Sequence, residues 1–293
     1  QVILTTHSPN LASKIPVANL VLLDNGHAYP MSPAKTRLDK SDYRLLGRLL
    51  DVTKANLFSA HGVFIVEGDA EAILLPVFAT MIGRDLTEHG VSIVNVGGTG
   101  LRRYSRIFQR QGDEASPIQI PVSRLSDLDV MPDCAPEILG LVADDSDPAW
   151  ENSKRRWKAH KDFTGDGRSI DDLRGRLSEG DDEYVRTFIS DHWTLEFDLA
   201  RTEFAKLVYI SAALARSDDA LTAEKKKPFS VMKQAMNDFR ELEKAQGGDP
   251  DRLATLIYKE FHSGAASKGV AAQYLADLLA SRAHRTSEEQ VRA

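Results

Sequence analysis

The sequence predicts an α/β protein in which a mainly parallel sheet is flanked by helices, together with an additional helical domain. Short apolar strands alternate with helical segments between residues 61 and 125, and this alternation implies right-handed crossovers between parallel strands. From residue 183 onward, apolar residues recur mostly at helical spacing. The length of 293 residues is also enough for about two domains.

The α/β segment divides into elements by composition. Strands are expected at 63–66, 91–96 and 118–125, because these runs are short and apolar. Helices are expected between the strands, at 70–82 and 101–110.

Smaller elements are expected before this segment. Residues 2–6 are apolar and β-branched, as in a strand, and Ser8-Pro9-Asn10 signals the start of a short helix. A strand at 20–23 runs into a hairpin turn at Asp24-Asn25-Gly26, and a connecting helix is expected over 40–58. The first 34 residues are too few to enclose a core and begin without methionine, so we expect a piece of a longer protein.

The second half predicts a polar excursion and then helices. Residues 144–182 are rich in acids and glycine, as at Gly165-Asp166-Gly167, and a basic helix is expected within them at 151–161. The helices expected after the excursion lie at 183–191, 195–216, 222–245, 250–261 and 267–283.

Composition excludes several classes of protein. No run of about 18 apolar residues exists, so no membrane span is expected. The single cysteine, Cys134, cannot form an internal disulfide, which fits a reducing, cytoplasmic location. The chain has 43 acidic and 37 basic residues, a net charge of −6, and this excess argues against a nucleic-acid partner.

Acidic residues follow two of the predicted strands. Glu67 follows the first strand, and Asp127 and Asp129 end the third. Ligands bind at the carboxyl ends of strands in an open parallel sheet, and an extended chain would point Asp127 and Asp129 the same way. Glu71, in the first turn of the next helix, can face the same place. Such carboxylates would repel one another without a cation, and hard oxygen ligands select Mg²⁺ or Mn²⁺.

Simpler interpretations of these acids stay open. Aspartate and glutamate after strands are common turn and N-cap residues. An isolated Asp-x-Asp also occurs in sugar-nucleotide transferases and in phosphatases. The combination of Glu67 with Asp127 and Asp129 is therefore more informative than either part alone.

This arrangement resembles the TOPRIM fold of topoisomerases, primases and certain nucleases. The matching segments are Val66-Glu67-Gly68-Asp69 and Leu125-Ser126-Asp127-Leu128-Asp129. Leu4-Thr5-Thr6-His7-Ser8-Pro9 is similar to the histidine-switch segment of ABC-type ATPases. An ATPase end followed by a TOPRIM domain is the order found in OLD (overcoming lysogenization defect) family nucleases, and the long helical C-terminus looks more like class 2.

Two later segments also resemble the OLD family. Thr194-Leu195-Glu196-Phe197-Asp198-Leu199 is similar to its acidic segment, and Ser267-Lys268-Gly269-Val270-Ala271 is similar to its Lys-Gly motif. The resemblance makes 1–34 the end of an ABC-type ATPase domain, 35–60 a connecting helix and 61–147 the TOPRIM catalytic core. Residues 148–293 would be an insertion and a helical domain that completes the active site.

The resemblance implies a metal-dependent DNA endonuclease that cleaves by a two-metal mechanism, with a role in phage defence or DNA repair. Residues implied as ligands of one or two Mg²⁺ or Mn²⁺ ions are Glu67, Glu71, Asp127, Asp129 and Glu196. Residues implied in catalysis are Glu67, Asp127, Asp129 and Lys268, the last through its positive charge. ATP would act only through the ATPase part. The implied partners are DNA, a second copy in a homodimer and a helicase, with no membrane.

Structural alternatives accompany these roles. Glu196 also fits a helix N-terminal acid behind a Thr194 cap, and Lys268 also fits a solvated surface lysine. Asp198 would lie around the helix from Glu196 and pair with Arg201. A topoisomerase-like or primase-like TOPRIM enzyme is the enzymatic alternative, although one cysteine excludes a zinc-binding cluster. A non-catalytic DNA-binding or dimerisation module is the other.

Several lesser motifs are expected to be structural. Gly97-Gly98-Thr99-Gly100 fits a tight turn, because it lacks the lysine placement of a P-loop. Asp144-Asp145-Ser146-Asp147 lacks the spacing of a calcium loop and fits a solvated loop. The basic stretch 154–161 fits either DNA backbone contact or a solvated helix face, and Lys225-Lys226-Lys227 fits a solvated charge run.

Overall fold

The computed structural model describes residues 2–98, 100–112, 116–164 and 169–292, with side chains as far as Arg282. Thr99 and Gly165-Asp166-Gly167 lie outside the described residues. The chain divides into two compact units. Unit 1 consists of Gln1–Gly68, Ile82–Ser126 and Ser178–Phe188, and unit 2 of Asp69–Met81, Asp127–Leu177 and Ile189–Ala293.

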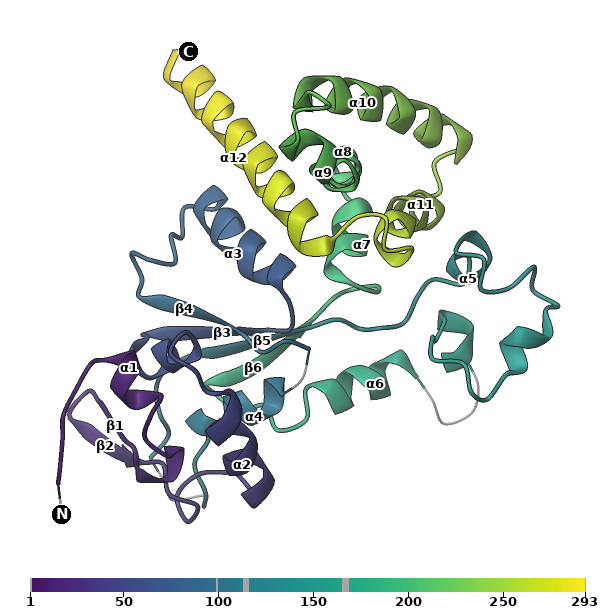
Figure 1. The fold of residues 1–293 in the computed structure, drawn as a ribbon. Helices are drawn as coiled ribbons and strands as arrows, with labels where there is room; N and C mark the ends of the chain where they lie inside the picture. Colours follow the sequence, from purple (N-terminus) through teal and green to yellow (C-terminus); the bar gives the residue numbers. More distant parts are fainter. Residues whose placement is uncertain (1, 99, 113–115, 165–168, 293) are drawn as a thin grey trace. The chain divides into compact units, whose positions relative to one another are not determined.

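Unit 1 is built on a four-stranded sheet with the order β4-β3-β5-β6 (Figure 1). Its strands are β3 (Gly62–Val66), β4 (Val91–Asn95), β5 (Val122–Ser126) and β6 (Val185–Ile189). β3 pairs in parallel with both β4 and β5, as the alternation of strands and helices predicts. The predicted α/β fold class is therefore confirmed.

The remaining elements of unit 1 include a hairpin. Asn25-Gly26 turns β1 back onto β2 with positive φ at both residues, as predicted. Asp39 opens α2 with a capping box. These elements are α1 (Pro9–Ala12), β1 (Val21–Asp24), β2 (His27–Pro30), α2 (Lys40–Leu49), α4 (Leu101–Ser105) and the 3₁₀ turns Val17–Asn19, Lys54–Ser59 and Arg106–Phe108.

The core of unit 1 joins the sheet to these smaller elements. Ile65 at the centre of β3 is fully buried, and Leu46 of α2 and Tyr104 of α4 belong to the same cluster. Met31, just after the hairpin, is also fully buried there. The hairpin segment and the α/β segment thus share one hydrophobic core.

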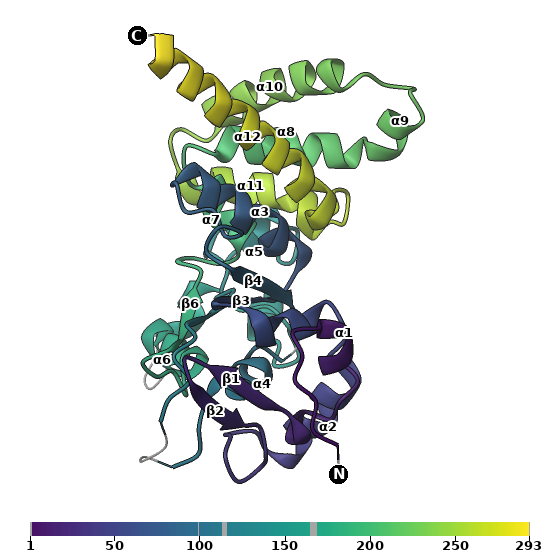
Figure 2. The same ribbon diagram turned by 90° about the vertical axis from the view of Figure 1, so that its left-hand side faces the viewer.

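Unit 2 is helical (Figure 2). Its long C-terminal helix, α12, packs against α3 and α8. The helices are α3 (Asp69–Met81), α5 (Ala135–Ile138), α6 (Ile170–Leu177), α7 (Leu195–Ala200), α8 (Ala205–Arg216), α9 (Asp218–Thr222), α10 (Pro228–Ala245), α11 (Pro250–His262) and α12 (Lys268–Arg292), with 3₁₀ turns at Pro148–Glu151 and His160–Phe163.

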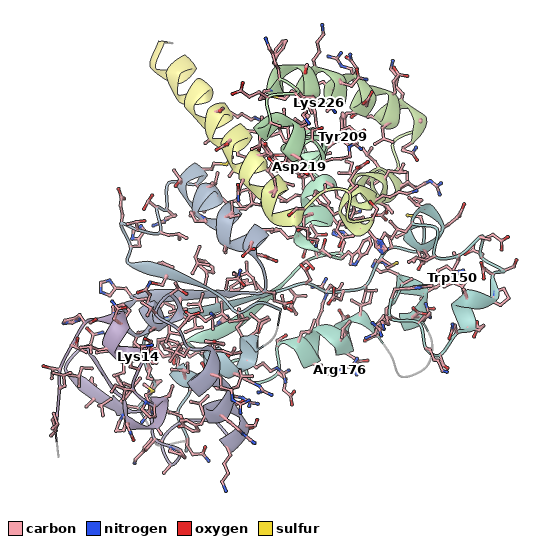
Figure 3. All side chains as sticks on the ribbon, viewed as in Figure 1. Lys14, Trp150, Arg176, Tyr209, Asp219 and Lys226 are labelled. Atoms are coloured by element: carbon pink, nitrogen blue, oxygen red, sulfur yellow. The ribbon has the colours of Figure 1, made fainter. Side chains whose placement is uncertain are left out.

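Aromatic contacts anchor the core of unit 2. The ring of Trp193 lies 5.4 Å from that of Phe197 and 4.4 Å from that of Tyr258, between ring centroids. Tyr209 of α8, labelled in Figure 3, lies 5.9 Å from Phe239 of α10. The contacts of Trp193 join the segment before α7 to α7 and α11, and the contact of Tyr209 with Phe239 joins α8 to α10.

Two predicted elements are absent from the described chain. The expected strand at 2–6 is wrong: these residues belong to no regular element, and Val2 and Ile3 are 92% and 85% exposed. Without a partner strand, a β-branched run has no ladder to join. The basic helix at 151–161 is also wrong. Trp150 and Trp157 stack edge to face there with a ring separation of 4.9 Å, and only short 3₁₀ turns form around them.

Other boundaries differ from the prediction. The expected helix at 183–191 is β6, in which buried Val185 is followed by alternating exposure. The third strand starts at Val122 instead of 118, directly after Pro121. The expected helix 195–216 is interrupted between α7 and α8, and the next long helix starts at Pro228, because proline suits the first helical turn.

The described part of the chain contains no helix that combines the length and the apolar character needed to cross a membrane.

Two isoleucines of unit 1 make a matched test of its core. Ile65→Ala should lower the free energy of unfolding by about 2–5 kcal/mol, because it leaves a cavity at a fully buried position. Ile82→Ala should change it by less than about 0.5 kcal/mol, because Ile82 is 75% exposed. Urea unfolding followed by circular dichroism measures both, and equal losses would contradict this assignment of the core.

Candidate metal centre

The side chain of Asp127 is held at the start of helix α7. Strand β5 ends at Ser126, and Asp127 follows directly. Its Oδ1 accepts a hydrogen bond of 3.0 Å from the backbone N–H of Leu195, the first residue of α7. Because the first N–H groups of a helix lack intrahelical acceptors, they give a carboxylate a fixed position.

The two aspartates of the Asp-x-Asp motif do not lie on an extended chain. Asp129 has φ = +57°, in the left-handed region, and its side chain is exposed whereas Asp127 is half-buried. The backbone N–H groups of Leu128 and Asp129 both donate to the carbonyl of Trp193. The extended-chain argument for their shared direction is therefore wrong, because the backbone turns to bond the segment before α7.

Glu196 and Lys268 form an ion pair with a distance of 2.8 Å between Oε2 and Nζ. Glu196 lies in the first turn of α7 and is buried, and Lys268 is the first residue of α12. Thr194 caps α7 by accepting from the N–H of Phe197, and its hydroxyl donates to Glu196. The expected Thr194 cap is thus present, and Glu196 is in addition a paired, buried carboxylate.

Two further residues lie near Lys268, Gly269 of the predicted Lys-Gly motif and Tyr258, which the sequence does not single out. The Lys268 ammonium lies 5.2 Å from the centre of the Tyr258 ring. Gly269 lies against the start of α3, where a Cβ would stand 3.5 Å from the Cβ of Asp69. Tyr258 occurs in an ordinary amphipathic helix, and no sequence signal distinguishes it from a core residue.

The carboxylates of unit 2 influence one another. Burial, followed by the negative charge of Glu196, raises the pKa of Asp127 from 3.8 to about 8, and the charges of Glu71 and Asp129 act in the same direction. The opposing effect comes from the positive charge of Lys268. Four predicted ligands and the predicted lysine therefore lie within electrostatic range of one another.

The ion pair also affects the lysine. Burial acts to lower the pKa of Lys268, but the charge and the hydrogen bond of Glu196 outweigh it, and the pKa rises above its ordinary value. Lys268 therefore stays charged across the physiological range. It supplies the positive charge next to Glu196 and Asp127.

Glu67 belongs to unit 1, at the end of β3. It accepts a hydrogen bond of 3.0 Å from the hydroxyl of Ser126, the last residue of β5. The carbonyl of Glu67 also accepts from the N–H of Gly98. Gly97 and Gly98 both have positive φ, so the expected tight turn is present in its described residues, and it orders the end of β3.

The donor chemistry fits a hard divalent cation, since carboxylate oxygens make up the whole predicted ligand set. Burial raises the pKa of Asp127 most, and the neighbouring negative charges raise it further, so a bound cation would favour the ionised carboxylate. Among the described residues, however, no three His, Cys, Asp or Glu side chains are arranged closely enough to hold an ion as they stand. Glu196 faces Lys268, so coordination by Glu196 would require its side chain to change partner.

A family model described as "Overcoming lysogenization defect protein-like, TOPRIM domain" matches residues 57–129. Residues 57–129 form an OLD-like TOPRIM domain. The predicted OLD-family resemblance is confirmed over this range, which contains Glu67, Glu71, Asp127 and Asp129. TOPRIM domains generally bind divalent metal ions, in agreement with the carboxylate donor set.

Solved C-terminal regions of OLD proteins are similar to this chain. For the Xanthomonas campestris pv. campestris protein, in a structure phased with mercury, identity is 22% and the TM-score is 0.37, covering 74% of this chain and 85% of that one. For the Burkholderia pseudomallei protein, identity is 19% and the TM-score is 0.31, covering 76% and 98%. The comparison with curated proteins gives no match.

Other residues singled out in the sequence lie elsewhere or have structural roles. The expected pair of Asp198 with Arg201 is wrong: Asp198 accepts from the N–H groups of Asp191 and His192, and Arg201 pairs with Asp251 at 2.8 Å. Those N–H groups precede α7, so Asp198 closes the loop before the helix. The side chains of His7, Asp144-Asp145-Ser146 and Lys225-Lys226-Lys227 are exposed.

Asp127→Asn tests the electrostatics in metal-free protein. The pKa of Asp127 is raised on folding, so its contribution to stability is complete below pH 3.8 and is lost as the pH rises towards 8. Asparagine does not titrate and can still accept from Leu195. In EDTA, the variant should therefore gain stability over wild type between pH 4 and pH 8, by on the order of 2 kcal/mol after solvent screening. Urea unfolding at a series of pH values measures this, and a constant difference would contradict it.

Proposed function

We propose that this chain is a divalent-metal-dependent DNA endonuclease, which uses Mg²⁺ or Mn²⁺ to hydrolyse phosphodiester bonds. The observation that carries the proposal is the group formed by Asp127, Glu196 and Lys268. Buried Glu196 pairs with Lys268, and the charge of the same lysine acts on half-buried Asp127. The match of residues 57–129 to the OLD-like TOPRIM family supports a nuclease-type enzyme.

Glu71, Asp127, Asp129 and Glu196 are the proposed ligands of unit 2, and the OLD resemblance adds Glu67 of unit 1. When bound, the ion would polarise a phosphoryl oxygen and lower the pKa of a water nucleophile. Asp127 is oriented for this role by the N–H of Leu195, so its carboxylate does not have to be ordered when an ion arrives.

Lys268 is proposed to stabilise negative charge on the reacting phosphate. Its ammonium is already next to Glu196, and its raised pKa keeps it charged at neutral pH. A fixed positive charge favours a transition state in which negative charge develops. If Glu196 turned to hold an ion, the ammonium of Lys268 would be available to a phosphate oxygen.

Cleavage of supercoiled plasmid tests this assignment. Asp127→Ala and Glu196→Gln should each lower the cleavage rate by about 100-fold or more, because each removes charge that holds the ion. Glu203→Gln is the matched control, since Glu203 is an exposed carboxylate of unit 2. Wild type should cleave with Mg²⁺ or Mn²⁺ and not in EDTA. Wild-type rates in Asp127→Ala would remove Asp127 from the mechanism.

Metal binding can be measured without cleavage. An ion that binds only the folded state should stabilise wild type by about 2.7 kcal/mol at about 100 times its dissociation constant. Glu196→Gln should lose most of this stabilisation and Glu203→Gln should keep it. Thermal unfolding with millimolar Mn²⁺, compared with EDTA, measures the effect. An equal shift in wild type and Glu196→Gln would place the bound ion elsewhere.

A further inference from the structure

Unit 1 contains an open cavity of about 540 Å³ whose lining is strongly polar. Four arginines line it, Arg37, Arg102, Arg106 and Arg124, with the acids Asp39 and Glu179. None of the described residues in its lining is aromatic or aliphatic. The cavity therefore offers several guanidinium donors and, among its described lining residues, no aliphatic or aromatic side chain on which a lipid chain would pack.

Arg124 is unusual among these arginines because it is almost completely buried, with 3% of its side chain exposed. It lies in strand β5 and pairs with Asp181 through Nη2. Its Nε has no hydrogen-bond partner in the described structure. A buried donor without an acceptor is costly, so the Nε of Arg124 favours an acceptor brought by a ligand.

Two other arginines, Arg106 and Arg37, also have guanidinium N–H donors that no described carboxylate accepts from. Arg106 contacts Asp39 and Asp42 through Nη1 only. Arg37 is exposed and forms no ion pair with any described carboxylate. A guanidinium has five N–H donors in a planar fork, so single-atom contacts leave donors for a further acceptor.

We propose that this cavity binds a phosphate group, with Arg37 and Arg124 as its principal donors. Arginine forks match the oxygens of phosphate, and several guanidinium groups together suit a multiply charged oxyanion. The volume exceeds a single phosphate and lies in the range of ordinary ligand pockets. The phosphate could belong to a free anion such as pyrophosphate or to the backbone of DNA, and only the DNA source rests on the proposed endonuclease function.

The competing interpretation is a self-contained network of ion pairs. Asp39, Asp42, Glu179 and Asp181 would then neutralise the arginines, and the cavity would hold only water. That network accounts for Arg102 and Arg106. It leaves the Nε of Arg124 without an acceptor and Arg37 without a carboxylate partner among the described residues, and these two groups favour a ligand.

Binding of inorganic phosphate and pyrophosphate to the intact chain tests the proposal. Isothermal titration in EDTA at constant ionic strength, with acetate as the control anion, isolates phosphate recognition from metal chemistry. Arg37→Gln should weaken binding about 10-fold, as expected for loss of a charged hydrogen bond. Lys35→Gln is the matched control, because Lys35 is an exposed cation two residues away that does not line the cavity. Arg124→Lys keeps the buried charge but lacks the fork, and should also weaken binding.

Fluorescence anisotropy with a short DNA duplex, also in EDTA, identifies the source of the phosphate. Weaker DNA binding by Arg37→Gln than by Lys35→Gln supports a backbone phosphate, and unchanged DNA binding with weaker pyrophosphate binding supports a free anion. The proposal is overturned if wild type binds neither anion at millimolar concentration and Arg37→Gln binds DNA as Lys35→Gln does. It is also overturned if Arg37→Gln and Arg124→Lys both bind the anions as wild type does. Phosphate binding without cleavage would reject the endonuclease but not this site.

Discussion

Repulsion among carboxylates is the constraint on which the candidate centre depends. Burial opposes ionisation of Asp127 most strongly, the charges of Glu196, Glu71 and Asp129 oppose it further, and the charge of Lys268 favours it. Metal-free protein can meet this constraint by retaining a proton on Asp127 and by pairing Glu196 with Lys268. A divalent cation would offset the same repulsion with two positive charges on one small ion. Protonation of Asp127, the ion pair of Glu196 with Lys268 and the binding of a divalent cation are therefore linked equilibria.

The scaffold of unit 2 holds these charges in position. The carbonyl of Trp193 accepts from both Leu128 and Asp129, while the indole ring packs on Phe197 and Tyr258. One residue thus ties the Asp-x-Asp segment to the aromatic core around α7 and α11. Because Asp127 also accepts from the first N–H of α7, displacement of that helix would move both Asp127 and Glu196. The positions of Asp127 and Glu196 therefore depend on aromatic packing in which no acidic residue takes part.

Features encoded by neighbouring residues were predictable from the sequence. The strands β3 and β4, the hairpin turn and the acids at the strand ends all carry local signals, and the structure contains them. Residues 183–191 predict a helix but form strand β6, because this short strand has no apolar run and pairing in the sheet sets its position. Likewise, Asp129 adopts positive φ because of a carbonyl more than 60 residues away, which no local pattern encodes.

The arginine cavity shows why net charge predicted so little about partners. The chain has an excess of six negative charges, yet Arg37, Arg102, Arg106 and Arg124 gather around one cavity. Electrostatic recognition acts over about 8–10 Å at physiological salt, so a ligand responds to the local arrangement instead of the total. Acids gathered around a cation can likewise become a phosphate-binding surface. An acidic chain is therefore compatible with a polyanionic ligand wherever folding separates positive from negative groups, and no composition reveals where that happens.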